Sequence, residues 1–300
     1  MTKLLLVDGS ALLHRAYHAY PPLKSKTGEI VGAVYGVLSM LLSTLGDITP
    51  SYVVVAWDLP KPTFRHVKYV GYKAQRPKAD AEMVEQIPLV KEMIASIPVL
   101  QIEREGYEAD DIIGTMSKHG SDENEVIILT GDQDAMQLVS EHVRVLTPAK
   151  GTNPPVMYGT NEVKDKYGVE PDKIVDYKAL IGDTSDNIPG VAGIGPKTAV
   201  ALINQYGGLE AIYECIDKID NPKIKEKLVA GRDSAILSLD LSKIVTDMEL
   251  EQKLEDMRYS GILSDNLKIK LEEYGFKSLL KRYFNEVTQS QKIDKQMGLF

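Results

Sequence analysis

The chain has 300 residues, of which 43% are apolar, and it carries 43 acidic against 35 basic side chains. This length allows one large core or two smaller ones, and a single cysteine, Cys215, excludes an internal disulfide and a cysteine-rich zinc site. No apolar run reaches the roughly 18 to 20 residues that span a bilayer, and Asp8 comes too early for a secretory signal. We therefore expect a globular cytoplasmic protein.

Short apolar segments alternate with helical patterns over residues 1–185. KLLLVD, YVVVAWD and EVIILTGD each have the pattern of a strand buried on both faces, as in a parallel sheet; HVRVLTP is a fourth candidate and VLQIE a fifth. Helical patterns lie between them at residues 32–47 and 83–97, the second interrupted by Pro88. The alternation predicts an α/β layered domain.

Strand patterns fade after residue 185, and helical patterns replace them. GPKTAVALINQYG, GLEAIYECIDKI, PKIKEKLVAG, SDNLKIKLEEYG and FKSLLKRYF are typical of helices, several of them ended by glycine. We expect a helical subdomain over residues 186–285. The last fifteen residues, EVTQSQKIDKQMGLF, predict a flexible tail over residues 286–300.

Aspartates stand where three predicted strands end, at Asp8, Asp58 and Asp132, and ligands of open α/β sheets bind beyond these ends. Further acids lie close to them in the sequence or share a spacing of three residues, which places a pair on one helix face. They are Glu108, Asp110, Asp111, Asp134, Asp183 and Asp186. An aspartate after a strand can instead cap the next helix, and this alternative stays open for each one taken alone.

Nine acids brought together need a counter-charge. Two carboxylates about 4 Å apart repel by roughly 4 kcal/mol at an effective dielectric constant near 20. No histidine or cysteine accompanies these acids, and oxygen-only ligands favour Mg²⁺ or Mn²⁺ over zinc. So many carboxylates predict two ions, the arrangement used for phosphodiester hydrolysis. Without these nine acids the acidic and basic residues nearly balance, so the net charge of −8 does not argue against a nucleic-acid partner.

A basic segment, KPTFRHVKYVGYKAQRPK, covers residues 61–78 and contains no acid. A solvated basic surface is the alternative interpretation. The interleaved Phe64, Tyr69 and Tyr72 favour a surface for phosphates and stacked bases. Lys73 and Arg76 are the candidates for groups that reach the scissile phosphate and stabilise its developing charge.

The glycine-rich stretch GVAGIGPKTA is neither of two common phosphate motifs. Pro196 precedes Lys197 where a Walker A loop has its second glycine directly before the lysine, and Thr198 stands where a dinucleotide fingerprint needs a third glycine. A hairpin between two helices fits instead, with Gly193 and Gly195 permitting the turn. The free N–H groups of the helix that Pro196 begins can bind a backbone phosphate without reading base sequence.

Five segments carry a family resemblance: LLLVDGSALLHRAYHA, FRHVKYVGYKAQR, GYEADDIIG, LTGDQDAMQLVS and GDTSDNIPGVAGIGPKTA. With them the chain resembles the 5′-nuclease (flap endonuclease) family, most nearly the 5′→3′ exonuclease domain of bacterial DNA polymerase I, up to about residue 285. The resemblance implies a three-layer α/β core with a mostly parallel sheet and a helical arch over about residues 60–100. It also implies a helix-hairpin-helix-type DNA-binding motif at which K⁺ can bind.

The resemblance assigns roles to individual residues. It implies a first Mg²⁺ site lined by Asp8, Asp58, Glu108, Asp110, Asp111 and Asp132. Asp132 bridges toward a second site with Asp134, Asp183 and Asp186. The implied catalytic residues are Tyr72, Lys73 and Arg76. The implied DNA-binding residues are Arg15, Tyr17, Arg65, Lys68, Gly193, Gly195, Lys197 and Thr198.

The predicted function is a structure-specific 5′ nuclease that cuts branched, nicked or flapped DNA and RNA primers, in Okazaki-fragment processing and repair, as a nucleoid-associated monomer. The end QMGLF resembles the peptide that docks bacterial proteins on the sliding clamp, through Gln296, Met297, Leu299 and Phe300. With no polymerase following, we expect a stand-alone nuclease. The alternatives are a related α/β RNA nuclease and a catalytically silent scaffold tethered to the clamp.

Overall fold

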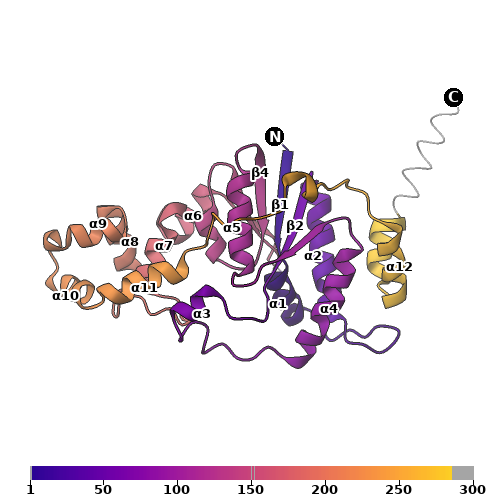
Figure 1. Cartoon of the computed structure of the whole chain (residues 1–300), viewed down its shortest axis with the longest axis horizontal. Coiled ribbons are helices and arrows are strands. Elements are labelled where there is room, and N and C mark those ends of the chain that lie inside the picture. The colour runs from indigo at the N-terminus through magenta and orange to yellow at the C-terminus, as the bar shows by residue number, and fades with distance from the viewer. Residues whose placement is uncertain (1, 150, 152, 286–300) are drawn as a thin grey trace.

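A six-stranded sheet forms the centre of the computed structural model, which describes residues 2–149, 151 and 153–285 (Figure 1). The strands are β1 (Thr2–Asp8), β2 (Tyr52–Trp57), β3 (Leu100–Glu103), β4 (Asn124–Leu129), β5 (Val143–Thr147) and β6 (Val156–Tyr158). Their order is β3-β2-β1-β4-β5-β6, and all neighbours are parallel except β6, which is antiparallel to β5. The predicted mostly parallel sheet is confirmed, with the short edge strand β6 added to it.

Helices cover both faces of this sheet. Alternate side chains of β1 enter different apolar cores: Leu4 and Leu6 belong to one core, and Leu5 and Val7 belong to the other. The first core is covered by α5 (Ala109–Gly120). The second is covered by α1 (Gly9–Ala19), α2 (Gly32–Ile48) and α4 (Ala81–Ala95). The predicted three-layer core is therefore confirmed, and its two buried faces explain the continuous apolar runs of the strands.

Helix α4 runs through Pro88, where the sequence predicted an interruption. Pro88 lies on the exposed side of this helix, as does Val84 one turn earlier. Water can therefore satisfy the Val84 carbonyl that the missing proline N–H leaves free. The opposite side of the helix is held in the second core by Val90, Met93 and Ile94.

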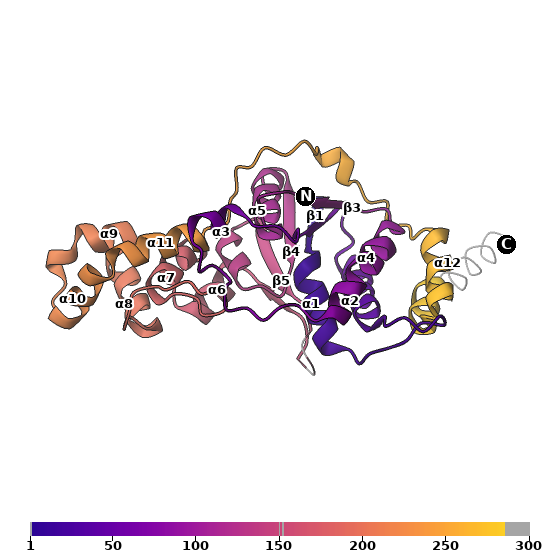
Figure 2. The ribbon, with the colours of Figure 1, turned by 60° about the horizontal axis from the view of Figure 1, so that its bottom comes forward.

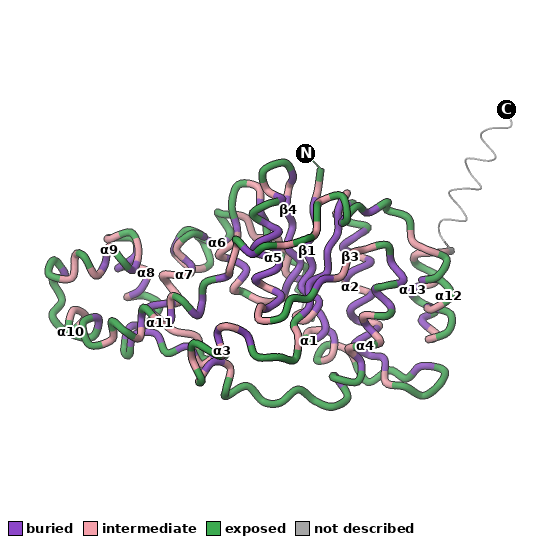
Figure 3. The backbone as a smooth tube through the Cα atoms, viewed as in Figure 1, coloured by how far each residue is buried: buried purple, intermediate pink, exposed green. Residues whose placement is uncertain are grey.

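The predicted arch is only partly helical. It begins with the short helix α3 (Phe64–Lys68), continues as turns and irregular chain through residues 69–80, and enters α4, which packs on the core. Residues 74–82 are all exposed, and Figure 3 shows this stretch as a continuous exposed segment between α3 and α4. The arch is thus a mostly irregular strap anchored to the core at α4.

The helices after β6 extend the molecule at one end (Figures 1 and 2). They are α6 (Thr160–Tyr167), α7 (Ile174–Ile181), α8 (Pro196–Tyr206), α9 (Leu209–Glu214), α10 (Pro222–Ala230) and α11 (Arg232–Ser242). Ile174, Leu180, Leu202 and Leu228 continue the first apolar core into this extension. The helical pattern predicted from residue 186 is therefore present, although α6, α7 and α11 had not been recognised.

The chain then returns to the opposite end of the molecule. Residues 243–264 cross the core with only a 3₁₀ turn at Leu254–Met257, as Figure 2 shows. They lead to α12 (Asp265–Tyr274), α13 (Lys277–Leu280) and a π-helical turn at Lys281–Asn285. Leu267, Leu271 and Phe276 pack in the second core with α2. The stretch predicted as one helical unit, residues 186–285, is thus divided between two places.

No helix among the residues described is long and apolar enough to cross a membrane.

Candidate active site

The carboxyl ends of β2, β1 and β4 lie side by side because these strands are neighbours in the sheet. Asp8 ends β1, Asp58 directly follows β2, and Asp132 follows β4. Together with Asp110, in the first turn of α5, they line a cavity of about 690 Å³. We call these four residues the strand-end acids. The structure brings them together at the sheet edge where the sequence predicted a ligand site.

Backbone N–H groups hold three of the strand-end acids, among them Asp132, whose Oδ1 accepts from the Asp134 N–H at 2.9 Å. Asp8 caps α1, because its Oδ1 accepts a hydrogen bond from the Ala11 N–H at 2.8 Å, and its Oδ2 accepts one from Thr130 Oγ1 at 2.8 Å. Asp58 Oδ1 accepts one from the Ala109 N–H at 2.8 Å. Helix capping and membership of the acidic site are therefore not exclusive at Asp8: the cap orients the carboxylate that lines the cavity.

The strand-end acids carry uncompensated charge. Within the described part of the chain, none of them is in an ion pair with a lysine or arginine. Burial, followed by the charge of Asp58, raises the pKa of Asp8 to about 7. Desolvation within the cavity, followed by Asp132 and Asp8, raises the pKa of Asp110 well above its ordinary value. In this half of the site, therefore, the carboxylates raise one another's pKa values and no lysine or arginine of the described chain offsets the effect by an ion pair.

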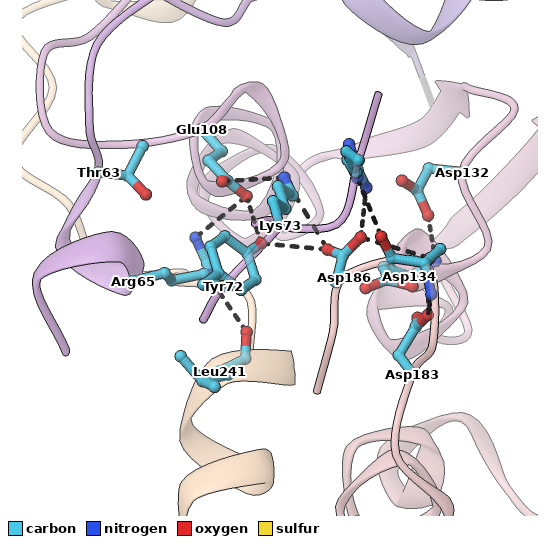
Figure 4. Close-up of polar contacts among 12 residues, drawn as sticks. Thr63, Arg65, Tyr72, Lys73, Glu108, Asp132, Asp134, Asp183, Asp186 and Leu241 are labelled. Atoms are coloured by element: carbon cyan, nitrogen blue, oxygen red, sulfur yellow. Dashed lines mark hydrogen bonds and ion pairs between the residues drawn. The ribbon is translucent and has the colours of Figure 1, made fainter. Parts of the chain in front are cut away.

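A second group of acids lies beside the first. Asp134 and Asp183 line a neighbouring cavity of about 670 Å³, and Asp132 and Gly131 line both cavities. We call Asp134, Asp183 and Asp186 the loop acids. Lys178 Nζ, from α7, bonds to Asp134 Oδ1 and, at 2.8 Å, to Asp183 Oδ2 (Figure 4). Unlike the strand-end acids, this half of the site contains its own cation.

Lys178 lowers the pKa of both of its partners, but the net shifts of the two differ. Burial would raise the pKa of Asp183, but Lys178 and Ser185 lower it to about 2. The pKa of Asp134 is raised to about 6 by burial and by Asp132, although Lys178 lowers it. Burial would lower the pKa of Lys178 itself, but the two carboxylates raise it above its ordinary value. Lys178 therefore remains charged.

A tight loop over residues 182–190 presents Asp183 and Asp186. Asp183 and Ile188 exchange backbone hydrogen bonds of 2.9 and 2.8 Å, which closes the loop. Gly182 has φ +76°, and a Cβ there would lie 2.5 Å from the Ile188 carbonyl oxygen, so the closure requires glycine. Asp183 Oδ1 also accepts from the Ser185 N–H at 2.8 Å.

The base of the arch is docked on this loop and on α5. The Lys73 N–H donates to the Asp186 carbonyl at 2.9 Å, and Lys73 Nζ lies 3.0 Å from Glu108 Oε1. Tyr72 donates from its hydroxyl to Glu108 and Asp186 at 3.1 and 3.2 Å, as Figure 4 shows. Burial, followed by Glu108 and Asp186, raises the pKa of Tyr72, so the phenol stays protonated and donates. Arg76 pairs with Asp186 and lines the first cavity together with Lys73.

Arg65 and Asp111 bind each other away from both cavities. Two parallel hydrogen bonds of 2.7 and 2.8 Å join the guanidinium of Arg65 to the carboxylate of Asp111, and the two residues are 2% and 0% exposed. Arg65 also donates to the carbonyls of Leu241 and Lys243 at 3.0 and 2.8 Å, and Asp111 accepts from the Val245 N–H at 2.9 Å. The Arg65 guanidinium and the Asp111 carboxylate are thus occupied by each other in a buried pair. These are the groups that would be needed for a DNA contact at Arg65 or a metal contact at Asp111.

The other residues predicted to bind DNA are spread over three surfaces. Arg15 lines the first cavity and donates to the carbonyls of Pro148 and Ala149, and Tyr17 lies on the same helix, α1. Lys68, on α3, pairs with Asp240 at 2.5 Å in an exposed contact.

The predicted hairpin precedes α8 as expected from its glycines and proline. Gly193 has φ +79°, and Gly195 is the N-cap of α8, so Pro196 is the first helical residue. Gly195 lines the second cavity with Asp134 and Asp183, while Lys197 is exposed on the first turn of α8 beside Thr198. The glycine-rich hairpin and the loop acids therefore border the same cavity.

Sequence reasoning missed Lys178. The segment IVDYKALIG contains Ile174, Tyr177 and Ile181 at helical spacing and ends in a glycine, a pattern typical of a helix. That pattern placed Lys178 on a helix five residues before Asp183, which could have indicated the pair.

The carboxylate oxygens of the site fit a hard divalent cation. The expectation that no histidine accompanies these acids was wrong, because His14 and His18 also line the first cavity. In the described ranges, however, no group of three or more acidic, histidine or cysteine side chains is arranged to hold a metal ion as it stands. Lys73, Arg76 and Lys178 instead bind several of the carboxylates. Side chains must therefore reorient for a metal to bind.

Comparison with known families identifies the chain. Residues 3–168 match the 5′-3′ exonuclease N-terminal resolvase-like domain, and residues 169–265 match the 5′-3′ exonuclease C-terminal SAM fold. The chain belongs to the 5′-3′ exonuclease family, a family of nucleases. The 5′-3′ exonuclease of Aquifex aeolicus (strain VF5) is 39% identical over 295 residues, which cover 96% of this chain and 99% of that protein.

Other relatives are longer or more distant. DNA polymerase I of Bacillus subtilis (strain 168) is 38% identical over 96% of this chain but only 33% of its own length, so the chain spans about a third of this relative. A bacteriophage T5 flap endonuclease, solved with DNA and metal ions, matches with a TM-score of 0.67 at 23% identity, over 81% of this chain and 89% of that one. Human GEN1 bound to Holliday junction DNA matches with a TM-score of 0.61 at 17% identity, over 93% of this chain and 71% of that one. These structures share the fold.

Proposed function

We propose that the chain is a divalent-metal-dependent 5′ nuclease that cuts DNA, and RNA primers, at branches, nicks and 5′ flaps. The observation that carries the proposal is the set of strand-end acids, Asp8, Asp58, Asp110 and Asp132, which share a cavity without a cationic side chain bound to them. Carboxylates arranged in this way either keep protons or bind cations at neutral pH, and divalent ions suit their oxygen donors.

The candidate metal ligands fall into two sets. The strand-end acids would hold the first ion, with Glu108 beside them, and the loop acids Asp134, Asp183 and Asp186 would hold the second. Asp132 lines both cavities and is the candidate bridge. When bound, two such ions supply an activated water and neutralise the charge of the phosphate and the leaving oxygen. The buried position of Asp111 favours leaving it out of both sets.

Residues of this chain would bind and orient the substrate. Lys73 and Arg76 line the first cavity, so an entering phosphate could take over their hydrogen bonds from Glu108 and Asp186. Tyr72 would hold Glu108 and Asp186 in place through its hydroxyl. Arg15, on the cavity wall, is the candidate contact for the nucleotide next to the cut, with Tyr17 nearby on α1.

The duplex would lie on the helical end of the molecule. The proposed contacts are the N–H groups that begin α8 and the side chains of Lys197 and Thr198, all of which hold phosphate without reading sequence. Because the hairpin borders the same cavity as the loop acids, a phosphate held there would fix the distance from the duplex to the cut. A K⁺ ion at this hairpin would have to displace Lys227 Nζ, which donates to the Gly193 carbonyl at 2.9 Å.

The cellular part of the proposal follows the family. Okazaki-fragment processing and repair are the reactions that consume such substrates, at the nucleoid. A monomeric state and docking on the sliding clamp belong to the same proposal. The clamp-binding residues Gln296, Met297, Leu299 and Phe300 lie outside the described residues.

A cleavage assay tests the function. A 5′-labelled flap duplex is incubated with the protein in Mg²⁺ and in EDTA, beside an RNA hairpin of equal length. The proposal expects flap cleavage only with Mg²⁺ and little cleavage of the RNA hairpin. Equal cleavage in Mg²⁺ and EDTA, or none in either, contradicts metal-dependent cutting, and preferred cleavage of the RNA hairpin supports the related RNA nuclease instead.

A further inference from the structure

Lys178 has two acidic partners inside the site. Its side chain is 13% exposed, and its Nζ contacts Asp134 Oδ1 and Asp183 Oδ2, each from a side chain that is 19% exposed. The ammonium therefore lies between two of the three loop acids, where a cation bridging them would have to lie.

The position of Lys178 is set by packing. Its helix, α7, is held in the first apolar core by Ile174, Ala179 and Leu180, so the backbone at Lys178 has little freedom. Asp183 is fixed in the closed loop that follows α7, and Asp134 begins the 3₁₀ helix Asp134–Leu138. The three charges come from separate, well-packed elements. Their meeting is therefore a property of the fold rather than of one flexible side chain.

We propose that Lys178 is a built-in counter-ion that holds Asp134 and Asp183 together in the metal-free protein and weakens the binding of a divalent cation there. An ammonium and a divalent ion cannot share the same two carboxylate oxygens, and they repel each other at such a distance. A metal ion binding between these acids must displace Lys178 and break two partly buried ion pairs. The strand-end acids impose no such cost.

This inference rests on the proposed function, and it predicts two metal sites of unequal affinity. The site at the strand-end acids is the stronger one, and the site at the loop acids is the weaker one. Lys178 would act on the weaker site alone. It is a positioning residue, because its effect passes through the carboxylates that it binds.

Titration calorimetry of Mn²⁺ into metal-free protein, without DNA, tests the idea. The variants are Lys178→Met and the control Lys164→Met. The control removes an exposed lysine of α6 that pairs with Glu170. In Lys178→Met the weaker site should tighten by about tenfold, the effect of losing a competing ion pair of moderate strength, while the stronger site is unchanged. Superimposable isotherms for the wild type and Lys178→Met would overturn the proposal.

Thermal unfolding gives a second readout. In EDTA, Lys178→Met should unfold at a lower temperature than the wild type and Lys164→Met, since Asp134 and Asp183 then repel without a cation between them. Mn²⁺ should raise its unfolding temperature by more than it raises that of the wild type; an equal rise counts against the idea. Lys178→Gln, also uncharged but able to donate a hydrogen bond, replaces the methionine variant if that variant does not fold.

The wild-type isotherm separates this inference from the proposed function. Absence of any Mn²⁺ binding by the wild-type protein removes the metal-dependent nuclease and the role of Lys178 together. Binding at two sites that is unaffected by Lys178→Met removes the role of Lys178 alone.

Discussion

The strand-end acids and two of the loop acids, Asp134 and Asp183, line neighbouring cavities. Among the described residues, cationic side chains bind the loop acids but none of the strand-end acids. The difference follows from the elements that carry them. Three of the strand-end acids lie at or just beyond the carboxyl ends of parallel strands, and Asp110 lies in the first turn of α5 beside them. No helix of the described chain brings a lysine into an ion pair with them. The loop acids face α7 and the base of the arch, which bring Lys178 and Arg76.

The comparison shows how one acidic site can serve both stability and metal binding. Unpaired carboxylates repel one another, and a bound divalent ion relieves this repulsion. The same repulsion that favours metal binding therefore lowers the stability of the metal-free fold. Paired carboxylates stabilise the metal-free fold and bind metal less readily. Replacing one acid in each half should therefore change stability in opposite directions.

Asp110→Asn should have the largest effect on activity. Asp110 lies among Asp8, Asp58 and Asp132, and removing its charge should lower flap cleavage by about a thousandfold or more, because a candidate metal ligand is lost. In EDTA the same variant should unfold at a higher temperature than the wild type, since the repulsion is relieved. The measurements are cleavage rates with Mg²⁺ and thermal unfolding without metal. The control is Asp122→Asn, which changes an exposed acid just after α5. Equal effects of the two variants would contradict the special position of Asp110.

Arg65→Met tests an acid that is completely buried together with its cationic partner. Asp111 is 0% exposed, so the variant leaves a buried carboxylate without its partner, and we expect a loss of about 3–5 kcal/mol in unfolding free energy. Urea unfolding measures it. The double variant with Asp111→Asn should lose less than the sum of the two single losses, because both changes break the same pair. Additive losses would show that the two side chains do not depend on each other.

Asp183→Asn should lower the stability of the metal-free protein, the opposite of Asp110→Asn. Lys178 keeps Asp134 but loses one of its two carboxylates, and we expect a loss of about 1–3 kcal/mol by urea unfolding in EDTA. Asp172→Asn, in an exposed pair with Lys173, is the matched control and should change stability by less than about 1 kcal/mol. A stabilised Asp183→Asn would mean that the loop acids are no better paired than the strand-end acids.

The sequence could place Asp8, Asp58 and Asp132 at one edge of the sheet, because continuous apolar runs identify the strands and these acids follow them. It could not separate Asp110 from Asp111. Adjacent helical residues point about 100° apart, and which of the two faces the cavity depends on how α5 packs. Nor could it pair Arg65 with Asp111 or Lys178 with Asp134, since each pair joins residues far apart in the chain. The division of residues 186–285 likewise depends on α12 and α13 returning to the second core.

The dependence of metal-free stability on pH should be the smallest of these effects and should distinguish Asp8 from Asp183. The pKa of Asp8 is raised from 3.8 to about 7 in the folded protein, so the folded state binds more protons than the unfolded state between these values. Its contribution to stability is full below the unfolded pKa and is lost as the pH rises through about 7. Asp183, whose pKa is lowered to about 2, contributes in the opposite sense, and its contribution is lost only when the pH falls through that value.

Between about pH 5 and about pH 8, then, Asp8 should respond and Asp183 should not, while Asp134, whose pKa is raised to about 6, adds to the same slope. In EDTA the unfolding temperature should fall by a few degrees as the pH rises. Mg²⁺ should oppose this fall, because the ion binds the deprotonated carboxylates and is most effective at the upper end of the range. Thermal unfolding with and without Mg²⁺ measures both slopes. In Asp8→Asn the slope in EDTA should flatten, whereas in Asp183→Asn it should stay as in the wild type. If the slope flattened in Asp183→Asn and not in Asp8→Asn, the unpaired charge would lie among the loop acids, and our assignment of it to the strand-end acids would be wrong.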